Sequence, residues 1–140
     1  MPTKVLLMIA LVWPFFMPSH NKPMAEDKNT IEGTWVIVAA ELSGQKLDSI
    51  RGTKLVLTAG RYQYQNDKGE YKLYPAEAAK AMDIVGLEGP NKGKTLLAIY
   101  ELDGDKLTIC YALTGQARPK EFKTEAGSRQ FLAIYERERN

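Results

Sequence analysis

Apolar and polar residues alternate along most of the chain after residue 30, in segments of four to twelve residues. In the segment 54–58, Leu55 and Leu57 fall on one face, and in 61–65, Tyr62 and Tyr64 do the same. A period of two residues is typical of β-strands that bury one face. The pattern predicts eight strands, at residues 31–42, 54–58, 61–65, 70–74, 82–85, 95–102, 106–112 and 130–137.

The connections between these segments are mostly short and rich in turn residues. Asn66–Gly69 is typical of a hairpin turn, and so is Asp103–Asp105. Residues 75–80 are expected to form a helical turn, and 114–128 is the longest irregular segment. Consecutive antiparallel strands form a meander, and eight of them can close into a small barrel without free edges. We therefore predict an all-β, eight-stranded antiparallel up-and-down barrel, with a β-sandwich as the alternative.

The first 25 residues have a different pattern. Lys4 precedes a nearly uninterrupted apolar run, Val5–Met17, and a polar stretch, Pro18–Lys22, follows it. This order is typical of a secretory signal, and the run is shorter than the roughly 20 residues that a membrane-spanning helix needs. We predict a signal in 1–25 with cleavage after Ala25, a flexible lead in 26–32, a barrel domain in 33–137 and a tail in 138–140. The protein is expected to be exported to the periplasm or the extracellular space. The alternative is an uncleaved signal, which would be its only contact with the membrane.

Composition narrows the chemistry of the exported domain. The chain has 19 Lys and Arg against 17 Asp and Glu, and cleavage after Ala25 removes Lys4 and Lys22, which leaves 17 against 17. A neutral domain offers no basic face to nucleic acid. The single histidine, His20, is also removed, which excludes His-dependent nucleophiles and His-ligated zinc. We expect no enzyme activity, cofactor, metal or nucleic-acid partner, and we expect the single cysteine, Cys110, to be a buried hydrophobe.

A set of short motifs over residues 31–138 resembles a family of small secreted lipocalin-like domains that is abundant in planctomycete bacteria. The motifs depart from the family at Tyr74–Ala76, where an Asp often precedes the Pro, and at Arg129, where a small residue is common. The resemblance implies a barrel and export, and it carries over no activity. The matching residues are Gly33–Trp35, Glu41, Gly44, Gly93, Lys94, Ile99–Leu107, Cys110, Tyr111, Arg118–Phe122, Gly127 and Ser128.

The same resemblance implies a structural role for the first and last strands. In such folds the Trp of the first strand packs across the barrel floor, and an Arg from the last strand covers it. Here these residues are Trp35, which follows Gly33, and Arg137. A guanidinium over an indole face stabilises by about 0.5–2 kcal/mol.

The predicted barrel interior is rich in tyrosine. On the alternating face we place Leu55, Leu57, Tyr62, Tyr64, Tyr71, Leu73, Met82 and Ile84, with Tyr100 and Tyr111 as further candidates. One interpretation is a cavity for a small apolar ligand, oriented by tyrosine hydroxyls. The other is a core filled by side chains, because eight strands are just wide enough for either.

Three other residues are candidates for ligand contact. Strict alternation places Glu41 on the same face as Trp35, where its carboxylate would bind a cationic group or remain solvated at the rim. Phe122 would cover the barrel mouth as a lid, and Arg118 would meet an anionic group; alternatively, Phe122 anchors its loop and Arg118 forms a salt bridge.

Together these patterns predict an exported, non-catalytic binding protein that holds a small apolar or amphipathic ligand in a barrel. The alternative is a filled barrel that binds a protein or another component of the cell envelope through its loops. An enzyme that uses carboxylates and tyrosines is the least favoured interpretation.

Overall fold

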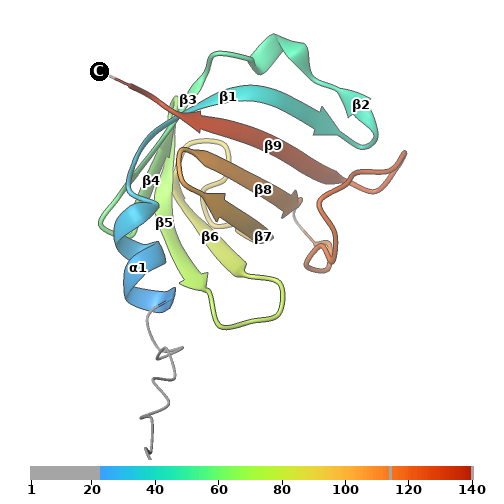
Figure 1. The fold of residues 1–140 in the computed structure, drawn as a ribbon. Helices are drawn as coiled ribbons and strands as arrows, with labels where there is room; N and C mark the ends of the chain where they lie inside the picture. Colours follow the sequence, from blue (N-terminus) through green and yellow to red (C-terminus); the bar gives the residue numbers. More distant parts are fainter. Residues whose placement is uncertain (1–22, 114, 140) are drawn as a thin grey trace, which may run out of the picture.

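The computed structural model describes residues 23–113 and 115–139, and it shows a closed antiparallel barrel with one short extra strand (Figure 1). Eight strands follow one another around the ring, and the first pairs with the last. The predicted fold class is therefore confirmed. The ring consists of β1 (Gly33–Leu42), β3 (Lys54–Thr58), β4 (Arg61–Tyr64), β5 (Asp67–Tyr74), β6 (Ala81–Glu88), β7 (Thr95–Asp103), β8 (Lys106–Ala112) and β9 (Gln130–Arg137).

Three smaller elements complete the described chain. The helix α1 (Pro23–Thr30) precedes β1, the two-residue strand β2 (Gln45–Lys46) pairs with the end of β1, and a 3-10 turn, η1 (Asp48–Ile50), follows it. Residues 26–30, expected to be part of a flexible lead, are thus helical, and the predicted cleavage site after Ala25 falls inside α1. Most of the predicted signal, residues 1–22, lies outside the described residues.

Two connections differ from the sequence-based expectation. β5 begins at Asp67, so the turn after β4 consists of Gln65 and Asn66, and Gln65 has a positive φ of 53°. Residues 75–80 contain turns and bends instead of a helical turn. Pro75 is buried at the start of this segment, and the segment packs toward the end of the barrel that α1 covers, through the ion pair of Lys80 with Asp27.

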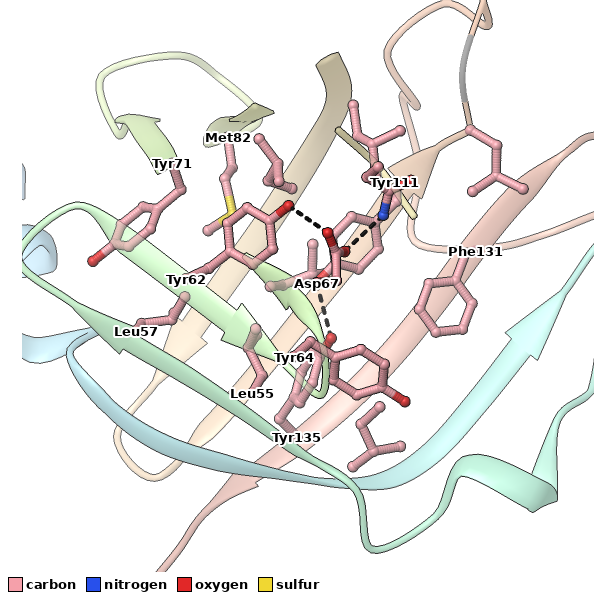
Figure 2. A pocket seen from close by; sticks show the side chains of 16 residues that line it. Leu55, Leu57, Tyr62, Tyr64, Asp67, Tyr71, Met82, Tyr111, Phe131 and Tyr135 are labelled. Carbon is pink, nitrogen blue, oxygen red and sulfur yellow. Dashed lines mark hydrogen bonds between the residues drawn. The ribbon is translucent and has the colours of Figure 1, made fainter. Parts of the chain in front are cut away.

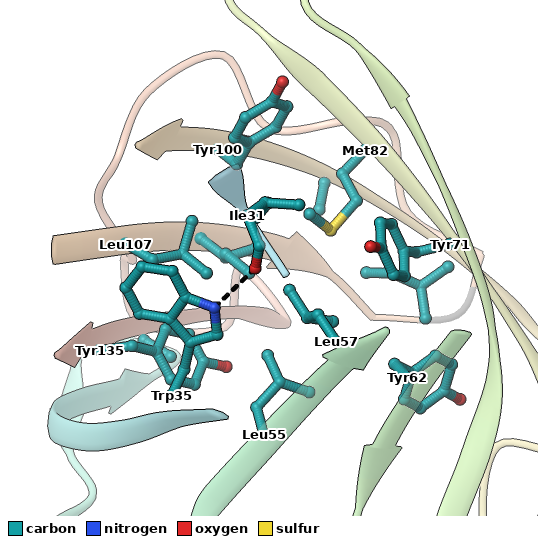
Figure 3. Close-up of a cluster of buried hydrophobic side chains, with 14 of the residues drawn as sticks. Ile31, Trp35, Leu55, Leu57, Tyr62, Tyr71, Met82, Tyr100, Leu107 and Tyr135 are labelled. Carbon is teal, nitrogen blue, oxygen red and sulfur yellow. Dashed lines mark hydrogen bonds between the residues drawn. The ribbon is translucent and has the colours of Figure 1, made fainter. Parts of the chain in front are cut away.

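The α1 end of the barrel is closed by Trp35, which lies among the buried side chains of Figure 3, and by Arg137. Trp35 is fully buried, and its indole N–H donates to the carbonyl of Ile31 over 2.8 Å. The Arg137 guanidinium lies over the Trp35 ring and donates to the carbonyl of Glu32. Gly33 makes this approach possible: its φ is +137°, and a Cβ there would lie 2.7 Å from Arg137 Nη1. One end of the barrel is therefore sealed by contacts between the first strand, the last strand and the α1 segment.

A buried carboxylate fixes α1 to this end. Asp27 is only 7% exposed; it accepts a hydrogen bond from the Tyr100 hydroxyl over 2.8 Å and pairs with Lys80 over 2.9 Å. Burial and the hydrogen bond to Asp27 raise the pKa of Tyr100. The hydroxyl therefore stays protonated and donates to the carboxylate, which satisfies both buried groups.

A bulge in β1 changes which face its last residues occupy. Ile37 pairs with Tyr135 of β9 and Ala39 pairs with Ile134, so Val38 is an extra residue in the ladder. An extra residue reverses the faces of all side chains that follow it. Ala40 accordingly points into the core, where it is 6% exposed.

Candidate functional site

A cavity of about 200 Å³ lies inside the barrel at the end opposite α1 (Figure 2). The deeper lining residues, such as Leu57 and Met82, are buried, whereas Tyr64, Asp67 and Phe131 are half-buried and lie near the strand ends away from α1. The cavity is therefore reached from that end. Its lining comprises Ile37, Leu55, Leu57, Tyr62, Tyr64, Asp67, Tyr71, Met82, Ile84, Asn91, Leu96, Ile109, Tyr111, Leu113, Phe131 and Tyr135.

Tyrosine hydroxyls supply most of the polar atoms of this cavity. The hydroxyls of Tyr111 and Tyr135 bond to each other over 2.8 Å, and Tyr111 stacks on Phe131 with ring centroids 5.5 Å apart. The Tyr64 hydroxyl bonds to Thr53 Oγ1 over 2.9 Å. The hydroxyl of Tyr71, a residue that is 9% exposed, has no partner within the described part of the chain. The walls thus combine apolar surface with hydroxyls at fixed positions.

Burial keeps these phenols neutral. It raises the pKa of Tyr111 well above its usual value and also raises that of Tyr135, and proximity of the two hydroxyls contributes to the effect on Tyr111. Burial, followed by the hydrogen bond to Asp67, raises the pKa of Tyr62. At neutral pH these groups therefore serve the cavity as uncharged hydrogen-bond donors and acceptors.

Of the described residues that line the cavity, Asp67 alone is charged. Its Oδ1 accepts from the Tyr62 hydroxyl over 3.0 Å and its Oδ2 accepts from Asn91 Nδ2 over 2.7 Å. Asn91 belongs to the loop between β6 and β7, and Gly89 lets this loop lie against the β4–β5 turn, because a Cβ there would be 2.3 Å from the Asn66 carbonyl. Backbone packing thus positions the carboxylate at the cavity.

Four of the tyrosines singled out from the sequence, Tyr62, Tyr64, Tyr71 and Tyr111, line the cavity. Tyr100 does not, although its side chain points inward. β7 runs toward the α1 end, so Tyr100 lies near that end and bonds to Asp27. Alternation along a strand defines the face of a residue, but it does not define the residue's depth in the barrel.

Glu41 also lies outside the cavity, which corrects the expectation from strict alternation. The bulge at Val38 turns Glu41 to the outer face, where it pairs in register with Leu132. Leu132 belongs to a small outer cluster with Ile99 and Cys110, so the Glu41 side chain faces the same way. The carboxylate contacts an outer groove formed with β2 and η1.

The long loop before β9 packs on the outside of the barrel and does not cover the mouth. Arg118 donates to the carbonyls of Met82 and Ala98 and pairs with Asp83, so it fixes the loop to β6 and β7. Phe122 is 36% exposed and is absent from the cavity lining. Arg118 therefore forms the salt bridge that the alternative interpretation expected, and Phe122 does not lie over the cavity as a lid.

Cys110 is fully buried beneath this loop, and its thiol donates to the Lys123 carbonyl over 3.7 Å. Burial raises the pKa of the thiol, which keeps it protonated and unreactive. This side chain is packed as a small hydrophobe.

Sequence reasoning missed Asp67, Asn91, Phe131 and Tyr135 as lining residues. Phe131, Ala133 and Tyr135 are spaced two residues apart on β9, so they share one face of the strand. The period of two therefore already indicated that Phe131 and Tyr135 face the interior. Asp67 and Asn91 lie in segments whose composition is typical of turns, where polar residues are common and do not indicate a site. Only the tertiary packing of those turns brings the two residues together.

Comparison with known proteins identifies no relative: no protein-family model matches the chain, and searches of curated proteins and of solved structures give no significant match. Within residues 23–113 and 115–139, no helix is long and apolar enough to cross a membrane. The same residues contain no group of three His, Cys, Asp or Glu side chains placed to hold a metal ion.

Proposed function

We propose that the protein is an exported, non-catalytic binding protein that holds a small apolar or amphipathic molecule inside its barrel. The observation that carries this proposal is the tyrosine-lined apolar cavity of about 200 Å³, accessible from one end. The resemblance of the sequence to secreted lipocalin-like domains supports the barrel and export, and the function itself rests on the cavity.

The size of the cavity limits the ligand. An apolar cavity of about 150 Å³ in an engineered protein stays dry and binds benzene. A cavity of about 200 Å³ therefore suits a single ring or a short branched chain with one polar substituent. Burial of this surface supplies affinity, and the fixed hydroxyls of the tyrosines orient the substituent.

The alternative function, a filled barrel that binds an envelope protein through its loops, draws less support. It needs an interior without space for a ligand, and the loop that would offer Phe122 and Arg118 is anchored to the outer wall through Asp83. The cavity thus favours ligand binding over loop-mediated interaction.

Native mass spectrometry of the protein, purified from its source organism, tests the proposal. We expect an additional stoichiometric mass that is lost after denaturing extraction. The variant Leu96→Trp should abolish this mass, because Leu96 lines the cavity. Leu97→Trp is the matched control: it makes the same change one residue along β7, on the opposite face. A ligand-free mass for the wild-type protein, or equal ligand content in the two variants, would contradict the proposal.

A further inference from the structure

We propose that the cavity selects small organic cations, in which an apolar group of about one ring carries a protonated amine, and that Asp67 is the counter-ion of that amine. This inference rests on the proposed function, and it names the class of ligand. Three observations at the cavity lead to it: the sign of its charge, the free acceptor sites of its carboxylate and the arrangement of its aromatic rings.

The charge of the lining favours a cation. Asp67 is a carboxylate in a lining that is otherwise formed by neutral side chains of the described residues. An anionic ligand would enter a partly desolvated space beside a negative charge, with no cation among the described lining residues to balance it. A protonated amine meets an opposite charge in the same space, and a charge-assisted hydrogen bond is about twice as strong as a neutral one.

The Asp67 carboxylate has room for a further donor. An ionised carboxylate offers about four acceptor sites on its two oxygens. Tyr62 occupies one site on Oδ1, and Asn91 occupies one on Oδ2. These two bonds hold the carboxylate in place, so a ligand amine finds a fixed partner and little side-chain entropy is lost on binding.

Tyrosine side chains lie beside the Asp67 carboxylate. Tyr62 bonds to Asp67 directly, and Tyr64 is its register partner in the β4–β5 ladder. Figure 2 shows Asp67 among these rings, with the bonded pair of Tyr111 and Tyr135 beside them. The face of an aromatic ring attracts a cation electrostatically. A protonated amine thus gains both a counter-ion and aromatic contacts, whereas a neutral group of the same size gains neither.

Three ring-sized probes test the proposal: benzylamine, benzyl alcohol and benzoate, titrated into the full chain by isothermal calorimetry. We expect benzylamine to bind at least about tenfold more tightly than benzyl alcohol, because a charge-assisted hydrogen bond contributes about 1.5–3 kcal/mol and each 1.4 kcal/mol is tenfold. Benzoate should bind most weakly. This comparison needs only the wild-type protein.

Two variants locate the effect. Asp67→Asn should remove most of the preference for benzylamine and leave the affinity for benzyl alcohol within about twofold. The change keeps the shape of the side chain, removes its charge and replaces one of its two acceptor oxygens with an amide donor. Asp48→Asn is the matched control: it removes a carboxylate from η1, where Asp48 is exposed outside the cavity, and should leave the preference unchanged.

The outcomes separate this inference from the proposed function. Equal binding of amine and alcohol by the wild-type protein, or a preference that survives Asp67→Asn, would overturn the cation proposal and leave ligand binding in place. If none of the three probes binds and native mass spectrometry finds no bound mass, both proposals fail.

Discussion

The guanidinium carbon of Arg137 lies 4.3 Å from the centroid of the Trp35 ring. The same guanidinium donates to the carbonyls of Thr30 and Glu32, and its Nε pairs with Asp105 in the β7–β8 turn. One side chain therefore joins the last strand to the first strand, to the end of α1 and to a neighbouring turn. The planar guanidinium donates hydrogen bonds through its N–H groups and stacks on the indole through its flat face. A lysine ammonium has no such planar group and cannot make both contacts.

We expect Arg137→Lys to lower the free energy of unfolding by about 2 kcal/mol, because it removes charged hydrogen bonds to the carbonyls of Thr30 and Glu32 and the stacking on the indole. Chemical denaturation followed by circular dichroism measures the change. Arg139→Lys is the matched control: Arg139 also pairs with Asp105, but its side chain is 84% exposed. Surface ion pairs contribute little, so this variant should stay within about 0.5 kcal/mol of the wild type. Equal losses in the two variants would show that Arg137 contributes only its charge.

The hydroxyls of Tyr111 and Tyr135 should behave as a coupled pair. Changing either residue to Phe leaves the other hydroxyl without its partner, and we expect each single variant to lose about 1 kcal/mol of stability. The double variant removes both polar groups and should lose little more than either single one. Tyr74→Phe serves as the control, because Tyr74 is the last residue of β5 and does not line the cavity that contains Tyr111 and Tyr135. Its effect on stability should therefore add to that of Tyr111→Phe. Additive losses at Tyr111 and Tyr135 would contradict the coupling.

Stability should fall at alkaline pH. The pKa values of Tyr62, Tyr111 and Tyr135 are raised in the folded state above the usual value of about 10. Below that value both states are protonated and the full stability is present. Above it the unfolded chain releases protons that the folded chain retains, so the free energy of unfolding decreases as the pH rises.

Absorbance of tyrosinate and circular dichroism, recorded together, test this dependence. We expect most tyrosinate to form in one cooperative step that coincides with loss of the strand signal. Tyr62→Phe removes one titrating group and should make the loss of stability with pH less steep. Gradual ionisation of all tyrosines near pH 10, with an unchanged strand signal, would contradict the prediction.

The strands were predictable where one face is buried and the other is solvated. β3 has the bounds that alternation gives, Lys54–Thr58, because Leu55 and Leu57 are buried in the core. β8 also has the expected bounds, Lys106–Ala112, although Cys110 and Ala112 are buried on its outer face as well. α1 was missed because residues 26–30 are all polar and show no apolar periodicity, and its docking depends on Asp27, Tyr100 and Lys80, which lie far apart in the sequence. A contact of this kind leaves no local periodicity.

The candidate site was predictable in part for the same reason. Tyr62 and Tyr64 follow the period of β4, and the cavity contains both. The expectation for Glu41 depended on an unbroken period in β1, and the bulge at Val38 is invisible in a sequence whose neighbouring positions are all apolar. Asp67 reaches the cavity through the packing of two turns, which sequence periodicity does not describe.

One edge of β1 pairs with β3, and the other edge is paired only when β9, the last strand of the ring, has been added. Trp35 and Arg137, which face each other across this seam, are about 100 residues apart in the sequence. Contacts of such separation form slowly, because a long loop must close before they contribute. Until β9 is in place, the free edges of β1 and β8 can pair with strands of other chains. A chain that ends before Gln130 would keep both edges open permanently, so the final strand decides whether newly made molecules fold singly or aggregate.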